Sequence, residues 1–96
     1  MRMMAKISIP VEPGNQGVTD GSLPKVIQAA AERWKPEAMY FSTFDGRRTA
    51  YFIFDLADTS DIPVFAEPFF RGLNAAVDLW PVMNVEDLQR GIGQLD

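Results

Sequence analysis

Eight residues from four separate segments carry the groups that could bind or transform a small molecule. They supply hydroxyls, aromatic rings, carboxylates and one ammonium. If the four segments are strands of one sheet, the alternation of side chains places these residues on the same face. Rings on such a face could stack on a small, partly aromatic ligand while the hydroxyls orient it. The predicted ligand-binding residues are Lys6, Ser8, Tyr40, Ser42, Tyr51, Asp55, Asp78 and Trp80.

Acid–base chemistry at this face would depend on carboxylates and phenols, because the chain contains no histidine and no cysteine. Ser-His-Asp relays, thiol nucleophiles, disulfides and the usual zinc sites are thereby excluded. Asp78 or Asp55 could act as a base, and Tyr40 or Tyr51 as an acid or oxyanion donor. No catalytic residue is assigned, and neither a metal nor a cofactor is predicted.

The same aromatic residues allow a second interpretation, in which the face is an interface between two copies of the chain. Tyrosine and tryptophan are enriched at protein–protein interfaces. A pocket within such an interface would combine both interpretations. Whether the protein is an enzyme therefore stays open.

The stretch from residue 38 to residue 56 predicts two strands joined by a tight turn. Asp45 and Gly46 lie between two runs rich in Tyr, Phe, Ile and Thr, and both tolerate the positive φ angles of a hairpin turn. Side-chain alternation then divides the hairpin into two faces. The face expected in the core consists of Met39, Phe41, Ala50, Phe52, Phe54 and Leu56.

The remaining elements predict a ferredoxin-like β-α-β-β-α-β domain with a short C-terminal helix. In this α+β fold, two helices cover one face of a four-stranded antiparallel sheet, and right-handed crossovers place the first and third strands in the middle. The expected order is a strand at 3–11, a loop at 12–21, a helix at 22–34, the hairpin at 38–56, a helix starting near 60, a strand at 75–83 and a helix starting at 85.

Local signals predict where the three helices begin and what holds the last one. Ser22, Thr59 or Ser60, and Asn84 have the side chains that commonly cap helix N-termini. Pro68 falls within the second helix, where it should produce a kink. The last helix is expected to be anchored by Val85, Leu88 and Ile92.

Length and charge narrow the possible partners. A chain of 96 residues is expected to form a single domain, residues 1–96. Its net charge of −4 argues against broad binding to nucleic acids or anionic membranes, which requires basic surface. A partial match to an RNA-binding strand pattern fails where Arg48 and Thr49 replace its glycine and first stacking aromatic. The N-terminus shows no export signal, so a cytoplasmic location is expected.

This pattern resembles the dimeric α+β barrel superfamily, and the segments Lys35-Pro36-Glu37, FDGRRTAYFIFDLAD and LWPVMNVEDL are similar to small bacterial families of unknown function within it. The resemblance implies a homodimer whose open sheet faces pack together, with a cavity inside or beside the joined sheets. It also implies the alternative of a cofactor-independent cyclase, isomerase or monooxygenase. Haem-degrading members are poor models, because this chain has no histidine.

Overall fold

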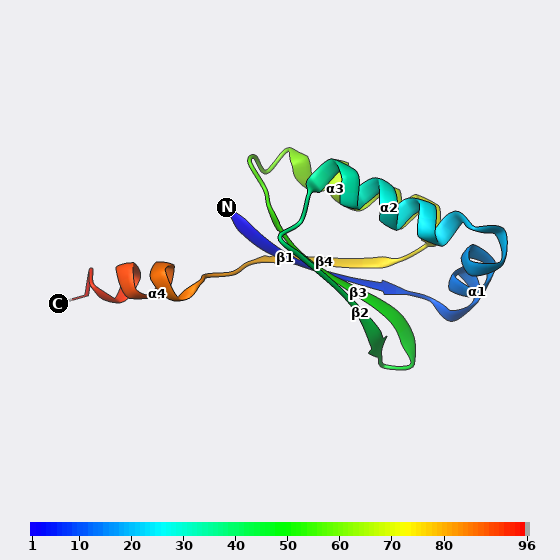
Figure 1. Ribbon diagram of the computed structural model, residues 1–96, viewed down its shortest axis with the longest axis horizontal. Coiled ribbons are helices and arrows are strands. Elements are labelled where there is room, and N and C mark those ends of the chain that lie inside the picture. Colours follow the sequence, from blue (N-terminus) through cyan, green and yellow to red (C-terminus); the bar gives the residue numbers. More distant parts are fainter. Residues whose placement is uncertain (96) are drawn as a thin grey trace.

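The computed structural model describes residues 1–95 and contains one four-stranded antiparallel sheet with four helices (Figure 1). The strands lie in the order β2-β3-β1-β4, so the first and third strands are central, as expected. The elements are β1 (Arg2–Ile9), α1 (Val11–Asp20), α2 (Ser22–Trp34), β2 (Ala38–Phe44), β3 (Arg47–Asp55), α3 (Asp61–Leu73), β4 (Ala76–Pro81) and α4 (Val85–Ile92).

The core lies between one face of the sheet and helices α2 and α3, which cover that face (Figure 1). Phe52 and Phe54 project from β3 into this layer and meet Phe65 and Phe69 of α3. The rings of Phe54 and Phe65 are stacked with their centroids 4.4 Å apart. Because large aromatic side chains bury much apolar area, this cluster contributes strongly to stability.

Residues 12–21 were expected to form a loop, and that prediction was wrong: α1 occupies this segment. Its first hydrogen bond runs from the Gly14 N–H to the Pro10 carbonyl, at 2.9 Å. Gly14 and Gly17 are the buried residues of α1. A Cβ at Gly17 would lie 2.9 Å from the Cβ of Leu23, so this glycine permits a close approach between α1 and α2. Gly17 therefore serves helix packing, and Gly14 lies close to Arg48 and Ile9 of the sheet.

Two predicted caps differ in the structure. Ser22 is the first helical residue of α2, while Gly21 occupies the capping position with φ 81°. The Ser22 N–H donates to Oδ1 of Asp20 at 2.8 Å, so Asp20 satisfies this helix start. Ser60 occupies the capping position of α3 without a side-chain cap, because its hydroxyl donates to Asp58.

Phe41 was expected in the core, but its side chain is 56% exposed. The β2–β3 hairpin bends away from the helical layer and extends beyond it (Figure 1). Phe41 therefore lies on the side of the sheet that alternation predicts, but it lines an open hollow with Leu23 and Ile27 of α2 instead of packing in the core. Met39, two residues earlier, packs against the core as expected.

The start of α4 was predicted correctly, but its anchoring was not. The Asn84 side chain accepts from the Asp87 N–H at 2.8 Å, and the Asp87 side chain accepts from the Asn84 N–H at 3.2 Å. Val85, Leu88 and Ile92, however, are 63%, 45% and 56% exposed. Figure 1 shows the reason: α4 projects from the end of β4, away from the sheet and helices.

None of the helices within residues 1–95 is both long enough and apolar enough to cross a membrane.

Candidate functional site

Four of the predicted residues form one row across all four strands. On the uncovered face, Tyr40 of β2 pairs with Tyr51 of β3, Tyr51 with Lys6 of β1, and Lys6 with Asp78 of β4. Directly opposed side chains on neighbouring strands start about 4.5–5.5 Å apart. The row therefore brings two phenols, an ammonium and a carboxylate together.

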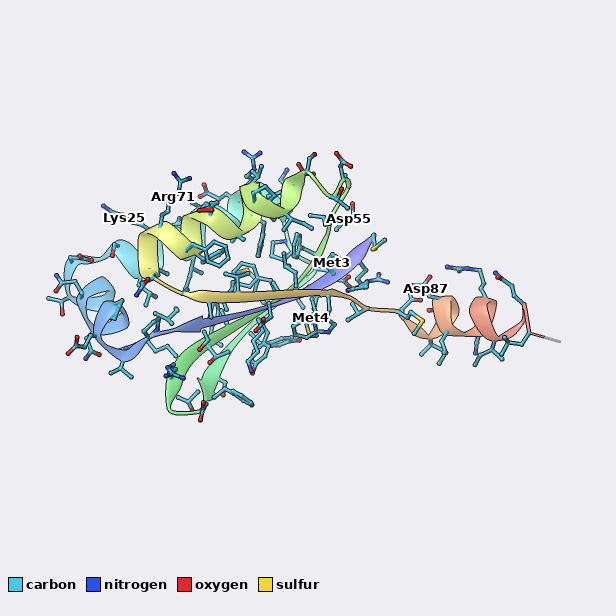
Figure 2. The ribbon with its side chains drawn as sticks, turned by 180° about the vertical axis from the view of Figure 1, so that it is seen from behind. Met3, Met4, Lys25, Asp55, Arg71 and Asp87 are labelled. Carbon is cyan, nitrogen blue, oxygen red and sulfur yellow. The ribbon has the colours of Figure 1, made fainter. Side chains whose placement is uncertain are left out.

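The rows on either side contain three more of the predicted residues. Ser42, Thr49 and Ser8 form the next row towards the hairpin, and Trp80 lies beside Met4 in the row towards α4. Figure 2 shows Met4 on the uncovered side of the sheet and Met3 on the side of the helices. Seven of the eight predicted residues therefore share one continuous surface.

Lys6 shows that this surface is curved. Its Nζ lies 3.5 Å from the centroid of the Phe44 ring. Phe44 is two strands away and four residues further along, so a flat sheet would hold the two Cα atoms about 16 Å apart. Their contact requires the hairpin to coil over the uncovered face, the direction in which it bends in Figure 2. The uncovered face is therefore a curved surface with Phe44 at one side, and we call this surface the trough.

Thr49 lies in this trough and is missing from the predicted set. It is only 3% exposed, and its hydroxyl donates to the Arg47 carbonyl at 3.1 Å. Its position between Ser8 and Ser42 follows from strand alternation and could have been predicted. Its burial could not, because strand alternation does not tell which residues of this face other segments cover.

The two charged residues of the row are not paired with each other. The ammonium of Lys6 contacts Phe44, and no ion pair within residues 1–95 engages the exposed Asp78. An exposed carboxylate beside aromatic rings can accept hydrogen bonds from a bound molecule. Lys6 can in turn donate to an anionic or carbonyl group if its ammonium leaves the ring.

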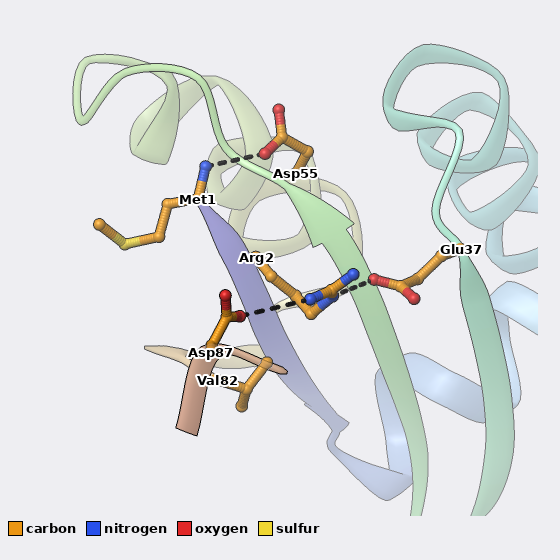
Figure 3. A pocket seen from close by; sticks show the side chains of 6 residues that line it. All are labelled: Met1, Arg2, Glu37, Asp55, Val82 and Asp87. Atoms are coloured by element: carbon orange, nitrogen blue, oxygen red, sulfur yellow. Dashed lines mark hydrogen bonds and ion pairs between the residues drawn. The ribbon is translucent and has the colours of Figure 1, made fainter. Parts of the chain in front are cut away.

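Asp55 lies apart from the other seven predicted residues. It is four residues from Tyr51 on β3, about 13 Å along the strand. Its Oδ1 accepts a hydrogen bond from the N-terminal ammonium of Met1 at 2.8 Å. Figure 3 shows it in a separate hollow of about 400 Å³ with Arg2, Glu37 and Asp87.

Arg2 is central to this second hollow. Its guanidinium donates to Glu37 and lies 3.7 Å from Oδ2 of Asp87 (Figure 3). The hydrogen bond and the negative charge of Glu37 raise the pKa of Arg2 above its ordinary value. Arg2 is thus a structural cation that joins β1, the start of β2 and α4. Within residues 1–95, no cluster of carboxylates has the arrangement of a metal site.

Two of the other hollows also lie outside the row. One, of about 400 Å³, runs along the β2 edge and includes Ser42 and Thr49 together with Phe41. The other, of about 290 Å³, lies between α2 and α3 and has a basic rim formed by Lys25 and Arg33. Only the first reaches residues of the predicted face.

No protein-family model matches the chain, and no curated protein matches its sequence. Among solved structures, it is similar to the de novo designed protein Ferredog-Diesel, with a TM-score of 0.52 and 10% sequence identity. The match covers 84% of this chain and 85% of that protein. At this identity the likeness concerns the fold alone. Together with the strand order, it supports a ferredoxin-like α+β fold with an additional C-terminal helix.

Proposed function

We propose that the protein is a homodimer whose uncovered sheet faces pack together, and that the trough between them binds a small, partly aromatic molecule. The observation that carries this proposal is the row Tyr40-Tyr51-Lys6-Asp78, which crosses the entire uncovered face. Rings on this row offer stacking, while Lys6 and Asp78 offer opposite charges. Such a mixture suits a ligand with an aromatic ring and polar substituents.

Exposure of the aromatic residues supports the pairing of two copies. Tyr40 is 65% exposed, and Phe44 and Trp80 are also accessible on the same face. A large apolar surface of this kind is typical of an association site. Two-fold pairing would bring the same patch from each copy together, as in most homodimers.

Ligand binding can be tested by NMR with a set of small aromatic carboxylates, phenols and amines. The proposal predicts shifts of backbone amides in the row and at Thr49, with weaker binding in Tyr51→Phe and Asp78→Asn. Glu67→Gln/Arg71→Gln, which alters an exposed ion pair on α3, is the control and should bind as the original chain does. Unchanged binding in both Tyr51→Phe and Asp78→Asn, or shifts confined to the α2–α3 hollow, would contradict the proposal.

A further inference from the structure

The helix α4 is amphipathic, but its polar side is the one turned towards its own domain. At 100° per residue, Val85, Leu88 and Ile92 lie within about 60° of one another, and Asp87 lies about 100° or more from each. Asp87 is the residue of α4 that approaches the rest of the chain, through Arg2 at 3.7 Å. The apolar stripe is therefore directed away from its own subunit.

The direction of the stripe matches that of the uncovered sheet face. In Figure 2, Asp87 is on the upper side of α4, the side of the helical layer, whereas Met4 lies below the sheet. The apolar stripe, opposite Asp87, therefore looks to the same side as Met4. A second copy that approaches the sheet face from this side meets α4 as well.

The β2–β3 hairpin offers a complementary surface towards the other end of the subunit. Phe44 lies on the uncovered face there and is more than half exposed. The hairpin segment 44–48 carries two arginines and one aspartate, for a charge of +1, whereas α4 carries Glu86, Asp87 and Arg90, for a charge of −1. The two segments thus carry opposite net charges. Arg47 pairs with Phe44 and shares its face, whereas Arg48 projects to the other face and donates to Asn15.

Within one subunit these two surfaces cannot meet. Arg47 is level with the residue after β1, whereas Trp80 is level with Met4, a separation of about 20 Å along the strands. The helix α4 begins still further away, and the subunit is 55 Å long. A two-fold axis parallel to the sheet on its uncovered side, and perpendicular to the strands, would place the hairpin end of one copy over the α4 end of the other.

A contribution from α4 would enlarge the interface formed by the paired sheet faces. Four strands about 4.8 Å apart, paired over six residues of β1 and β4, give a face of roughly 400 Å² in outline. A standard interface takes about 800 Å² from each partner. The accessible area of the face exceeds this outline because its side chains protrude, and α4 and the hairpin tip would add further area from both copies.

We infer that α4 is an exchanged arm, whose apolar stripe packs on the β2–β3 hairpin of a second copy of this chain. This inference rests on the proposed pairing of uncovered sheet faces. It adds the contact that fixes how the two copies are oriented. Each subunit contributes one arm and binds the arm of its partner, so the assembly is complete with two copies.

A spin label gives the most direct test, because the chain has no cysteine and one introduced thiol is unique. The label is attached to Gln94→Cys, just beyond α4, and this chain is mixed with ¹⁵N-labelled, unmodified chain. The inference predicts line broadening at amides 44–48 of the ¹⁵N-labelled copy. Broadening at the α2–α3 hollow instead, or none at all in a sample that light scattering shows to be dimeric, would overturn the arm while leaving the sheet pairing intact.

A substitution pair measures how much the arm contributes. Leu88→Gln/Ile92→Gln removes the apolar stripe, keeps net charge and helix propensity, and should raise the dimer dissociation constant about tenfold or more. Glu67→Gln/Arg71→Gln, also neutral in net charge, should change it less than about twofold. An equal effect of the two variants would contradict the arm. A chain that is monomeric at every concentration would overturn both the arm and the proposed sheet pairing.

Discussion

Lys6 and Asp78 lie directly opposite each other on β1 and β4, but the Lys6 ammonium contacts the ring of Phe44 instead of the carboxylate. The cation therefore holds the coiled hairpin against the sheet, while the carboxylate stays available. The contact of Lys6 with Phe44 thus shapes the trough, and the Asp78 carboxylate remains as a hydrogen-bond acceptor. The contact also makes the shape of the trough sensitive to a single aromatic residue.

The contact between Lys6 and Phe44 should be measurable as a coupling in stability. A partly solvated cation–π pair contributes about 0.5–1 kcal/mol. Urea denaturation of Lys6→Met, Phe44→Leu and the double variant should give a coupling energy of this size. Strict additivity of the two single effects would show that the ammonium does not hold the hairpin.

Phe65 should be among the most costly residues to truncate. It is 1% exposed, and it contacts Trp34, Phe52, Phe54 and Phe69. Phe65→Ala is expected to lower the free energy of unfolding by about 3–5 kcal/mol. Phe70→Ala, on the same helix but 42% exposed, is the matched control and should cost much less. Similar losses for the two variants in chemical denaturation would contradict the position of the core.

Two glycine-to-alanine substitutions should have opposite effects, because α1 is packed against the domain and α4 projects from it. Gly17→Ala places a Cβ 2.9 Å from Leu23 Cβ and should destabilise the domain, because Leu23 packs against the core. Gly91→Ala adds a Cβ in open space. It should stabilise the helical state of α4 by up to about 1 kcal/mol, and so raise the helix content, without destabilising the domain. Circular dichroism and thermal unfolding measure both effects. Tolerance of Gly17→Ala would contradict the close packing of α1.

The carboxyl group of Asp20 should titrate at an unusually low pH. Its hydrogen bonds with Ser22 lower its pKa below the ordinary value. A lowered pKa means that the contribution to stability is present above the unfolded-state pKa and is lost as pH falls through the folded-state pKa. NMR titration should show the low pKa, and Ser22→Ala should move it towards the ordinary value. An unshifted pKa in the original chain would contradict this helix start.

The sequence predicted those parts of the fold that local rules control. Alternation along the strands was enough to place Tyr40, Tyr51 and Lys6 on one face, and Asp45-Gly46 was enough to locate the turn. The capping box at Asn84 was likewise predictable, because its partners lie three residues apart. In each case the physical cause lies within a few residues of the effect.

The parts that were missed depend on contacts between distant segments. A composition rich in Gly, Asn and Pro favoured a loop at 12–21. In the structure, the absence of a side chain at Gly17 allows Leu23 of α2 to pack closely against α1. Alternation assigned Phe41 to the core side, but it cannot tell how far the helices reach. The burial of Thr49, the coiling that brings Phe44 to Lys6 and the direction in which α4 projects all depend on contacts between segments distant in the sequence.

The molar mass in solution tests the central claim most directly. Light scattering at micromolar concentration should give twice the 10.7 kDa of one chain for the original protein and for Glu67→Gln/Arg71→Gln. Tyr40→Glu, which adds a charge at an exposed position of the row, should give the mass of a single chain. A single-chain mass for the original protein, or a dimer unaffected by Tyr40→Glu, would contradict the pairing of the uncovered faces.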